Sequence, residues 1–184
     1  MRARQYLKTI EAAAEALMRA LGMARAELSL TVVTDRAIRR LNREFRGQDR
    51  PTDVLSFPQF DPASAPVPAA FAGAAPVALG DVVISFETAA RQARELGVSV
   101  EARMRTLLIH GMLHLLGYDH ERSAAAARRM FAREHELAAL LTGGASAKSA
   151  SAAKRGWSPA AMPPRRRARQ SDAPSRRRAG LSAP

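Results

Sequence analysis

The sequence contains no cysteine among its 184 residues. Disulfide bonds are therefore excluded, and so is every zinc site that depends on thiolate ligands. Aromatic residues are scarce as well, with one Trp, two Tyr and six Phe. A metal site in this chain has to use histidine, aspartate or glutamate, and the lack of cysteine is consistent with a reducing compartment.

Long apolar runs are also missing. No segment approaches the run of about eighteen consecutive apolar residues that a transmembrane helix requires. The amino-terminal stretch MRARQYLKTIEAAAEALMRALG starts with basic residues but then mixes charged and apolar residues at a helical period, unlike a signal peptide. We expect a soluble, cytoplasmic protein that does not contact a membrane.

Positive charge is concentrated at the carboxyl end. The formal net charge is +12, and ten of the 29 Lys and Arg residues lie within 142–184, where Asp172 is the single acid. This segment is rich in Gly, Ser, Ala and Pro and has little apolar surface to bury, so we expect a disordered basic tail. Its arginine blocks leave two interpretations open, contact with RNA or a neutral solubilising extension.

Residues 1–141 are periodic and carry the patterns of both helices and strands, and their length is enough for one domain. Apolar residues recur at helical intervals in some segments and alternate in others. A segment rich in Pro and Ala, at about 59–77, fits neither pattern and is expected to be a surface insertion. The predicted elements, in chain order, are a helix at about 5–21, a strand at 27–34, a helix capped by Asp35 and reaching Phe45, strands at 54–58 and 79–86, and helices at about 87–96, 100–116 and 124–141.

Three of the four histidines fall in the run HGMLHLLGYDH (110–120). His110 and His114 are one helical turn apart, so they project from one face of the predicted helix. Gly117 can adopt the left-handed conformation that ends a helix and so return His120 to the same point. Three imidazoles with a fourth position left to water are typical of catalytic zinc. We therefore predict one zinc ion per chain, bound by His110, His114 and His120.

The same run is similar to the HExxHxxGxxH motif of zinc peptidases, with one difference. The glutamate that serves those enzymes as general base is replaced by Gly111, which has no side chain to accept a proton. Peptide hydrolysis by the usual route is therefore not expected, although a metal ion would still polarise a phosphoryl oxygen. The fourth histidine, His135, lies among charged residues and is assigned to a solvated helix face.

Two further motifs, NREFRGQDRPTDVLSFP (42–58) and LGDVVIS (79–85), precede the histidine run. Together the three motifs resemble the YbeY family of bacterial endoribonucleases, over roughly residues 25–125. The resemblance implies a single α/β domain with a mixed four-stranded sheet flanked by helices. It also implies zinc-dependent cleavage of single-stranded RNA, with roles in 3′-end maturation of small-subunit ribosomal RNA and in ribosome quality control.

The resemblance further marks Arg46 for activity, and we take Arg46 and His110 as the candidate catalytic residues. A guanidinium presents a planar fork that matches a phosphate group, so Arg46 is suited to hold the scissile phosphate. Four carboxylates lie near the motifs, and they are Asp49, Asp53, Asp81 and Asp119. Asp53, in the loop with Asp49, fits a turn or cap role better than that of a general base, and Asp81 at the start of a strand either points into the cleft or is structural. Of these, Asp119 directly precedes a predicted ligand and could orient its imidazole.

The expected partners are single-stranded RNA, ribosomal RNA in particular, and the small ribosomal subunit. One competing hypothesis is a ribosome-assembly factor whose zinc is structural and whose RNA contacts matter more than cleavage. The absence of an obvious general base favours that hypothesis, while a three-ligand zinc site favours catalysis. A zinc peptidase is the remaining alternative.

Overall fold

The structure is a computed structural model that describes residues 2–59 and 77–142. The insertion predicted at about 59–77 and the basic tail predicted at 142–184 lie outside the described residues, apart from the terminal positions 59, 77 and 142. The domain boundary near residue 141 therefore stays a prediction.

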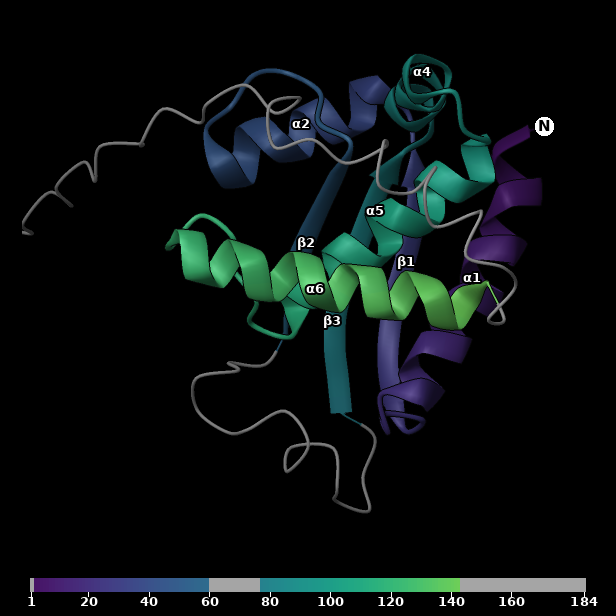
Figure 1. The fold of residues 1–184 in the computed structure, drawn as a ribbon. Coiled ribbons are helices and arrows are strands. Elements are labelled where there is room, and N and C mark those ends of the chain that lie inside the picture. The colour runs from purple at the N-terminus through teal and green to yellow at the C-terminus, as the bar shows by residue number, and fades with distance from the viewer. Residues whose placement is uncertain (1, 60–76, 143–184) are drawn as a thin grey trace, which may run out of the picture.

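A small mixed sheet forms the centre of the molecule (Figure 1). Its strands are β1 (Ala26–Val33), β2 (Val54–Pro58) and β3 (Val77–Ser85), in the order β1-β3-β2. β1 runs parallel to β3, and β2 runs antiparallel to β3. The parallel pair requires a crossover, which α2, β2 and the segment after it provide.

The mixed α/β class is confirmed, but the predicted number of strands is wrong for the described residues, which hold three strands in place of four. The number four came from the family resemblance. The alternating patterns in the sequence itself mark only three strands, at 27–34, 54–58 and 79–86, and the structure has a strand at each of them.

Five helices are present in the described ranges: α1 (Arg2–Ala20), α2 (Asp35–Arg46), α4 (Phe86–Leu96), α5 (Val100–Leu115) and α6 (Ala124–Leu141). The last three begin at serine caps whose hydroxyl groups accept a hydrogen bond from the backbone three residues later. None of the five is both long and apolar enough to cross a bilayer.

The cap of α2 differs from the sequence prediction. Thr34 is the cap and accepts from the Ala37 N–H at 3.3 Å, while Asp35 is the first helical residue. The Asp35 carboxylate instead accepts hydrogen bonds from the hydroxyl groups of Ser85 and Thr88 at the start of α4. Burial raises the pKa of Asp35, but these bonds and Arg91 outweigh burial and lower that pKa overall. Asp35 therefore joins two helices, which a local pattern does not reveal.

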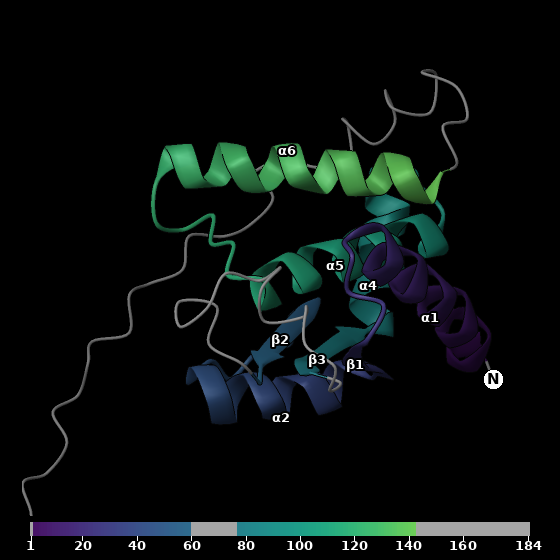
Figure 2. The ribbon, with the colours of Figure 1, turned by 90° about the horizontal axis from the view of Figure 1, so that it is seen from below.

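The helices are arranged in layers about the sheet. Figure 2 shows α2 on one face, α5 on the opposite face and α6 beyond α5. Adjacent side chains of β3 point to opposite faces of the sheet. Val82 packs in the larger hydrophobic core, between the sheet and α5, and Val83 packs in the smaller one, between the sheet and α2. Ten of the sixteen residues of α5 are buried. The helix that carries the histidine motif is thus the central element of the fold.

Candidate metal centre

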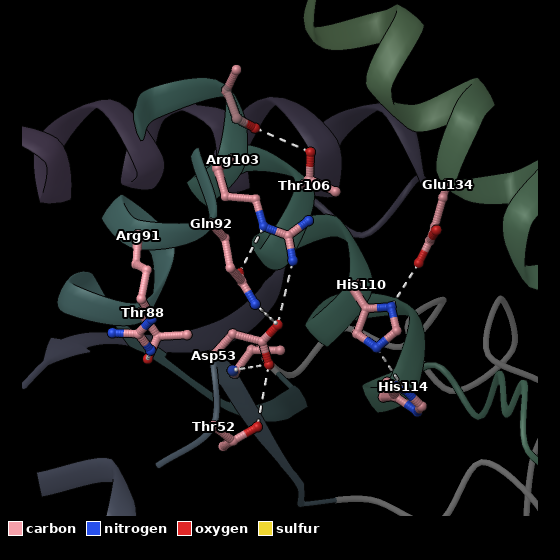
Figure 3. Close-up of polar contacts among 12 residues, drawn as sticks. Thr52, Asp53, Thr88, Arg91, Gln92, Arg103, Thr106, His110, His114 and Glu134 are labelled. Atoms are coloured by element: carbon pink, nitrogen blue, oxygen red, sulfur yellow. Dashed lines mark hydrogen bonds and ion pairs between the residues drawn. The ribbon is translucent and has the colours of Figure 1, made fainter. Parts of the chain in front are cut away.

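Two histidines lie one turn apart near the carboxyl end of α5 (Figure 3). The Nε2 atoms of His110 and His114 are 3.1 Å apart, and their ring centres are separated by 4.6 Å. His110 is buried and His114 is partly buried. Because α5 is packed against the sheet on one side and α6 on the other, the two imidazoles are held by a rigid element.

The end of α5 brings the third histidine to the same place. Gly117 has φ 84°, its N–H donates to the His114 carbonyl, and the Tyr118 N–H donates to the Leu113 carbonyl, each at 3.0 Å. This pair of bonds is the Schellman motif, in which a left-handed residue reverses the chain after a helix. The His120 ring centre consequently lies 5.3 Å from each of the two helical imidazoles.

The three imidazoles form a group that can hold a metal ion. One ligand nitrogen from each of His110, His114 and His120 lies within 4.8 Å of the other two. Tetrahedral zinc with bonds of about 2.0–2.1 Å would bring such nitrogens to about 3.3 Å from one another. The observed spacing needs only small side-chain rotations to reach that value, so the donor set fits the ion.

A carboxylate from the next helix supports the first histidine. The Glu134 Oε1 atom on α6 lies 2.7 Å from the His110 Nδ1 atom, and only about a tenth of each side chain is exposed, 10% and 11% for His110 and Glu134. A neutral His110 that donates its Nδ1 proton to Glu134 has its lone pair on Nε2, which faces His114. Glu134 therefore selects the tautomer that a metal ion requires.

The sequence analysis did not single out Glu134, although a signal was present. Met130 lies four residues before it and Leu137 three residues after it, and both are fully buried. An acid in the apolar row of a helix is costly to bury unless it has a partner. The neighbouring His135 and Glu136 are exposed, as the sequence analysis expected of His135.

The role of Glu134 is open to a direct measurement. We expect Glu134→Gln to weaken zinc binding about 10- to 100-fold, because a neutral amide is a poorer acceptor for the His110 Nδ1 proton. Glu136→Gln is the matched control on the same helix, since Glu136 is exposed and pairs with Arg133. Competition titration with a chromogenic chelator would give both affinities. Equal zinc affinity in Glu134→Gln and the parent chain would contradict this role.

The position after the first histidine faces the sheet. A Cβ atom on Gly111 would lie 2.9 Å from Val82 Cγ1, 3.1 Å from Ser56 Oγ and 3.3 Å from Val54 Cγ2. A glutamate at this position would point into the packed layer between α5 and the sheet and away from the imidazoles. The lack of a peptidase-type general base thus follows from the close approach of α5 to β2 and β3.

A second buried polar cluster lies on the same side of α5, toward its amino end (Figure 3). The Asp53 Oδ2 atom accepts from Gln92 at 3.2 Å and from Arg103 at 3.3 Å, and Arg103 also donates to Gln92 at 2.9 Å. Burial lowers the pKa of Arg103, and the charges of Asp53 and Glu134 oppose that effect. The cluster ties α4, α5 and the start of β2 together, so Asp53 has a structural role.

Arg46 is the last residue of α2 and is exposed. Gly47, with φ 65°, ends the helix directly after it, and the Asn42 amide holds the following loop through the Arg50 carbonyl at 2.7 Å. The helix that carries Arg46 packs on the face of the sheet opposite to α5 (Figure 2). Arg46 and the helical histidines therefore belong to helices on opposite faces of the sheet, so the structure groups the three histidines but not Arg46 with them.

The remaining carboxylates have local partners. Asp49 is held by the Arg39 guanidinium at 2.8 and 2.9 Å, a hydrogen bond that lowers the pKa of Asp49. Asp81 accepts from the Gln59 amide at 3.0 Å. Asp119 accepts from the Glu121 N–H at 2.8 Å, as a turn residue does. The carboxylate that contacts His110 comes from α6 instead.

Comparisons of the sequence with protein families and with individual proteins identify the same family. A family model described as Endoribonuclease YbeY matches residues 1–142. An Endoribonuclease YbeY of Anaeromyxobacter sp. is 51% identical over 137 residues, which cover 74% of this chain and 66% of that protein. The corresponding protein of Geobacter sulfurreducens is 48% identical over 132 residues, covering 71% and 83%.

A solved structure shares the fold. The solution structure of TM1509 from Thermotoga maritima is similar with a TM-score of 0.55 and 26% sequence identity. The match covers 82% of this chain and 91% of that one. The similarity therefore supports the mixed α/β fold described above.

Proposed function

The chain belongs to the YbeY endoribonuclease family, and from this premise we propose that it hydrolyses phosphodiester bonds in single-stranded RNA with the help of one zinc ion. The proposed substrate is ribosomal RNA of the small subunit, and the proposed roles are 3′-end maturation and ribosome quality control. The relatives bear the name Endoribonuclease YbeY, which states the reaction class but not the RNA.

The convergence of three imidazoles is the observation that carries the proposal. Three protein ligands leave the fourth tetrahedral position open, an arrangement typical of catalytic zinc, whereas structural zinc has four protein ligands. A zinc ion bound there would supply a Lewis acid that polarises a phosphoryl oxygen. The residues of the chain then have two tasks, which are to hold the imidazoles in place and to position the phosphate.

Glu134 performs the first task in this proposal. It fixes the ring of His110 through a bond of 2.7 Å, and the surrounding core prevents that ring from turning away. Ligands that are already held in place need little free energy of reorganisation during the reaction. Their interactions can therefore stabilise the transition state more than the ground state.

Arg46 is proposed for the second task. Its guanidinium keeps its positive charge at any physiological pH and can donate two parallel hydrogen bonds to a phosphate. The exposed position at the end of α2 leaves the guanidinium accessible to a polynucleotide. In the proposed sequence of events Arg46 holds the phosphate and a water molecule attacks the phosphorus. The bond between the phosphorus and the leaving ribose oxygen breaks, and that oxygen takes up the proton that the attacking water gives up.

The decisive experiment compares cleavage with binding. We expect the purified full chain to cleave unstructured ribosomal RNA fragments when loaded with zinc and to leave them intact after treatment with a chelator. Fully base-paired RNA should resist. Binding of the same fragments without cleavage, at full zinc occupancy, would favour the assembly-factor alternative over the proposed nuclease.

Substitutions of Arg46 should change the rate of RNA cleavage by a predictable factor. Arg46→Ala should lower the rate of RNA cleavage at least tenfold, since the loss of a phosphate contact removes on the order of 1.4 kcal/mol of transition-state stabilisation. Arg46→Lys should restore activity only in part, because an ammonium group cannot make two parallel bonds. Zinc content and thermal midpoint should not change. An unchanged cleavage rate in Arg46→Ala would exclude the proposed role.

A further inference from the structure

Helix α2 carries an unusual amount of positive charge. Residues 35–50 contain six arginines against three acids. We define the arginine face as Arg36, Arg39, Arg40 and Arg43, all of which are exposed. None of these four side chains belongs to the group of three histidines, which α5 and the turn after it carry (Figure 2).

The spacing of the arginines places them in two rows. Arg36, Arg40 and Arg43 follow the interval of four and then three residues that puts side chains on one helix face. A second row starts at Arg39, shares Arg43 and ends at Arg46. The arginine face is therefore continuous with the residue proposed to hold the scissile phosphate.

The acids of this region neutralise the arginine face only in part, because three acids stand against six arginines. Asp35 is turned toward the start of α4, where Ser85 and Thr88 donate to it. Asp49 binds Arg39, and that exposed pair contributes little to stability. Like charges one turn apart, as at Arg36 and Arg40, destabilise a helix by a few tenths of a kcal/mol. The row of arginines therefore does not stabilise the helix. Binding of an anionic ligand explains its presence better than a contribution to the fold.

An exposed aromatic ring lies beside Arg46 at the end of α2, although the helical period turns it away from Arg36 and Arg40. Phe45 is 59% exposed beside Arg46, and its ring centre lies 5.0 Å from that of Phe57, with the rings at 67° to each other. Proteins that bind single-stranded nucleic acid combine a cationic track along the backbone with aromatic rings on which bases stack. An acidic protein surface would use the arginines but would gain little from the exposed ring.

We infer that the arginine face of α2 is a second contact surface for RNA, which takes the single-stranded segment that flanks the phosphate held at Arg46. This inference rests on the proposed function, because it assigns a binding surface to the same substrate. It also explains why the charge is placed on one exposed helix and ends at the proposed catalytic arginine.

The test removes three charges from α2 and, in a control, three charges from elsewhere. The two variants are the α2 variant, Arg36→Gln with Arg40→Gln and Arg43→Gln, and the control variant, Arg19→Gln with Arg94→Gln and Arg128→Gln, which changes exposed arginines of α1, α4 and α6. Both keep the full chain, so residues 143–184 are identical throughout. Glutamine matches arginine closely in helix propensity, so both variants should fold.

Affinity is measured by fluorescence anisotropy over a salt series, with unstructured RNA of about 24 nucleotides and of about six. For the long RNA, the α2 variant should bind at least tenfold more weakly at low salt, and the slope of log affinity against log salt should fall by about 2, since each single-stranded phosphate contact contributes about 0.7. The control variant should keep the parent slope for the long RNA. Cleavage of the short RNA should be equal in all three chains, and the thermal midpoint of the α2 variant should equal or exceed that of the parent.

The outcomes separate this inference from the proposed function. A parent chain that cleaves RNA, together with an α2 variant of parental affinity and slope, would overturn the inference alone. A parent chain that binds RNA through α2 and never cleaves it would overturn the proposed nuclease and leave the inference intact. Competition by polyglutamate as strong as that by RNA of equal charge would overturn the assignment to RNA in favour of an acidic protein.

Discussion

Replacing His114 with alanine is expected to remove both the bound metal and the cleavage of RNA. Zinc sites with four ligands have apparent binding free energies of about 10–16 kcal/mol, or about 2.5–4 kcal/mol for each ligand. The loss of one of three imidazoles should therefore weaken zinc binding by at least a factor of about one hundred. Elemental analysis and competition titration would measure the change. His114 is only partly buried, so the fold should survive its removal.

The chain supplies a matched control for this variant. His135→Ala removes an exposed imidazole from α6, directly after Glu134. It should leave zinc content, zinc affinity and cleavage at the level of the parent chain. Full zinc occupancy in His114→Ala, or an equal loss in the two variants, would refute the assignment of the metal ligands.

A side chain at position 111 is expected to destabilise the fold. Gly111→Ala gains about 1 kcal/mol of helix propensity. Against this gain, its Cβ atom would meet Val82 at 2.9 Å and Ser56 at 3.1 Å, and overpacking of a core typically costs about 1–3 kcal/mol. We expect a net loss in the free energy of unfolding, measured by urea denaturation. Gly111→Glu would restore the peptidase motif, yet it should lose more stability and gain no peptidase activity, since a carboxylate would be buried against the sheet.

The cause of the Gly111→Ala effect can be isolated by a double-mutant cycle. Val82→Ala removes the Cγ1 atom that the new methyl group would meet. The double variant should be more stable than the sum of the two single effects predicts, by about 0.5–3 kcal/mol. Strict additivity would show that the methyl group is accommodated without contact to Val82 and would refute the packing argument.

Local patterns were sufficient to predict most of the fold. The predicted helix at 100–116 is α5, Val100–Leu115, and the predicted strand at 54–58 is β2 with the same bounds. These elements have strong apolar periods and clear start and stop residues, such as the cap Ser99 and the terminating Gly117. The convergence of the three histidines could be predicted for the same reason, because all three lie within one helix and the turn that follows.

The supporting residues could not be predicted in that way. Glu134 lies 24 positions from the histidine it contacts, and Asp53 and Arg103 lie 50 positions apart. Their pairing depends on how α6 and β2 pack on α5, and no local period encodes that packing. Asp119 was considered instead because it adjoins His120, but adjacent side chains in a turn point in different directions, and Asp119 binds the turn backbone.

The contact between Glu134 and His110 joins two helices that follow one another in the chain, with a short connection of eight residues or so between them. Because an ion that binds the imidazoles favours the ring orientation that Glu134 holds, occupancy of the centre and docking of α6 are thermodynamically linked. A ligand at about a thousand times its dissociation constant stabilises the state that binds it by about 4 kcal/mol. The backbone amides of α6 should therefore exchange their hydrogens with solvent more slowly in the metal-loaded protein. The exchange rate of this helix would then depend on how much of the protein has bound metal.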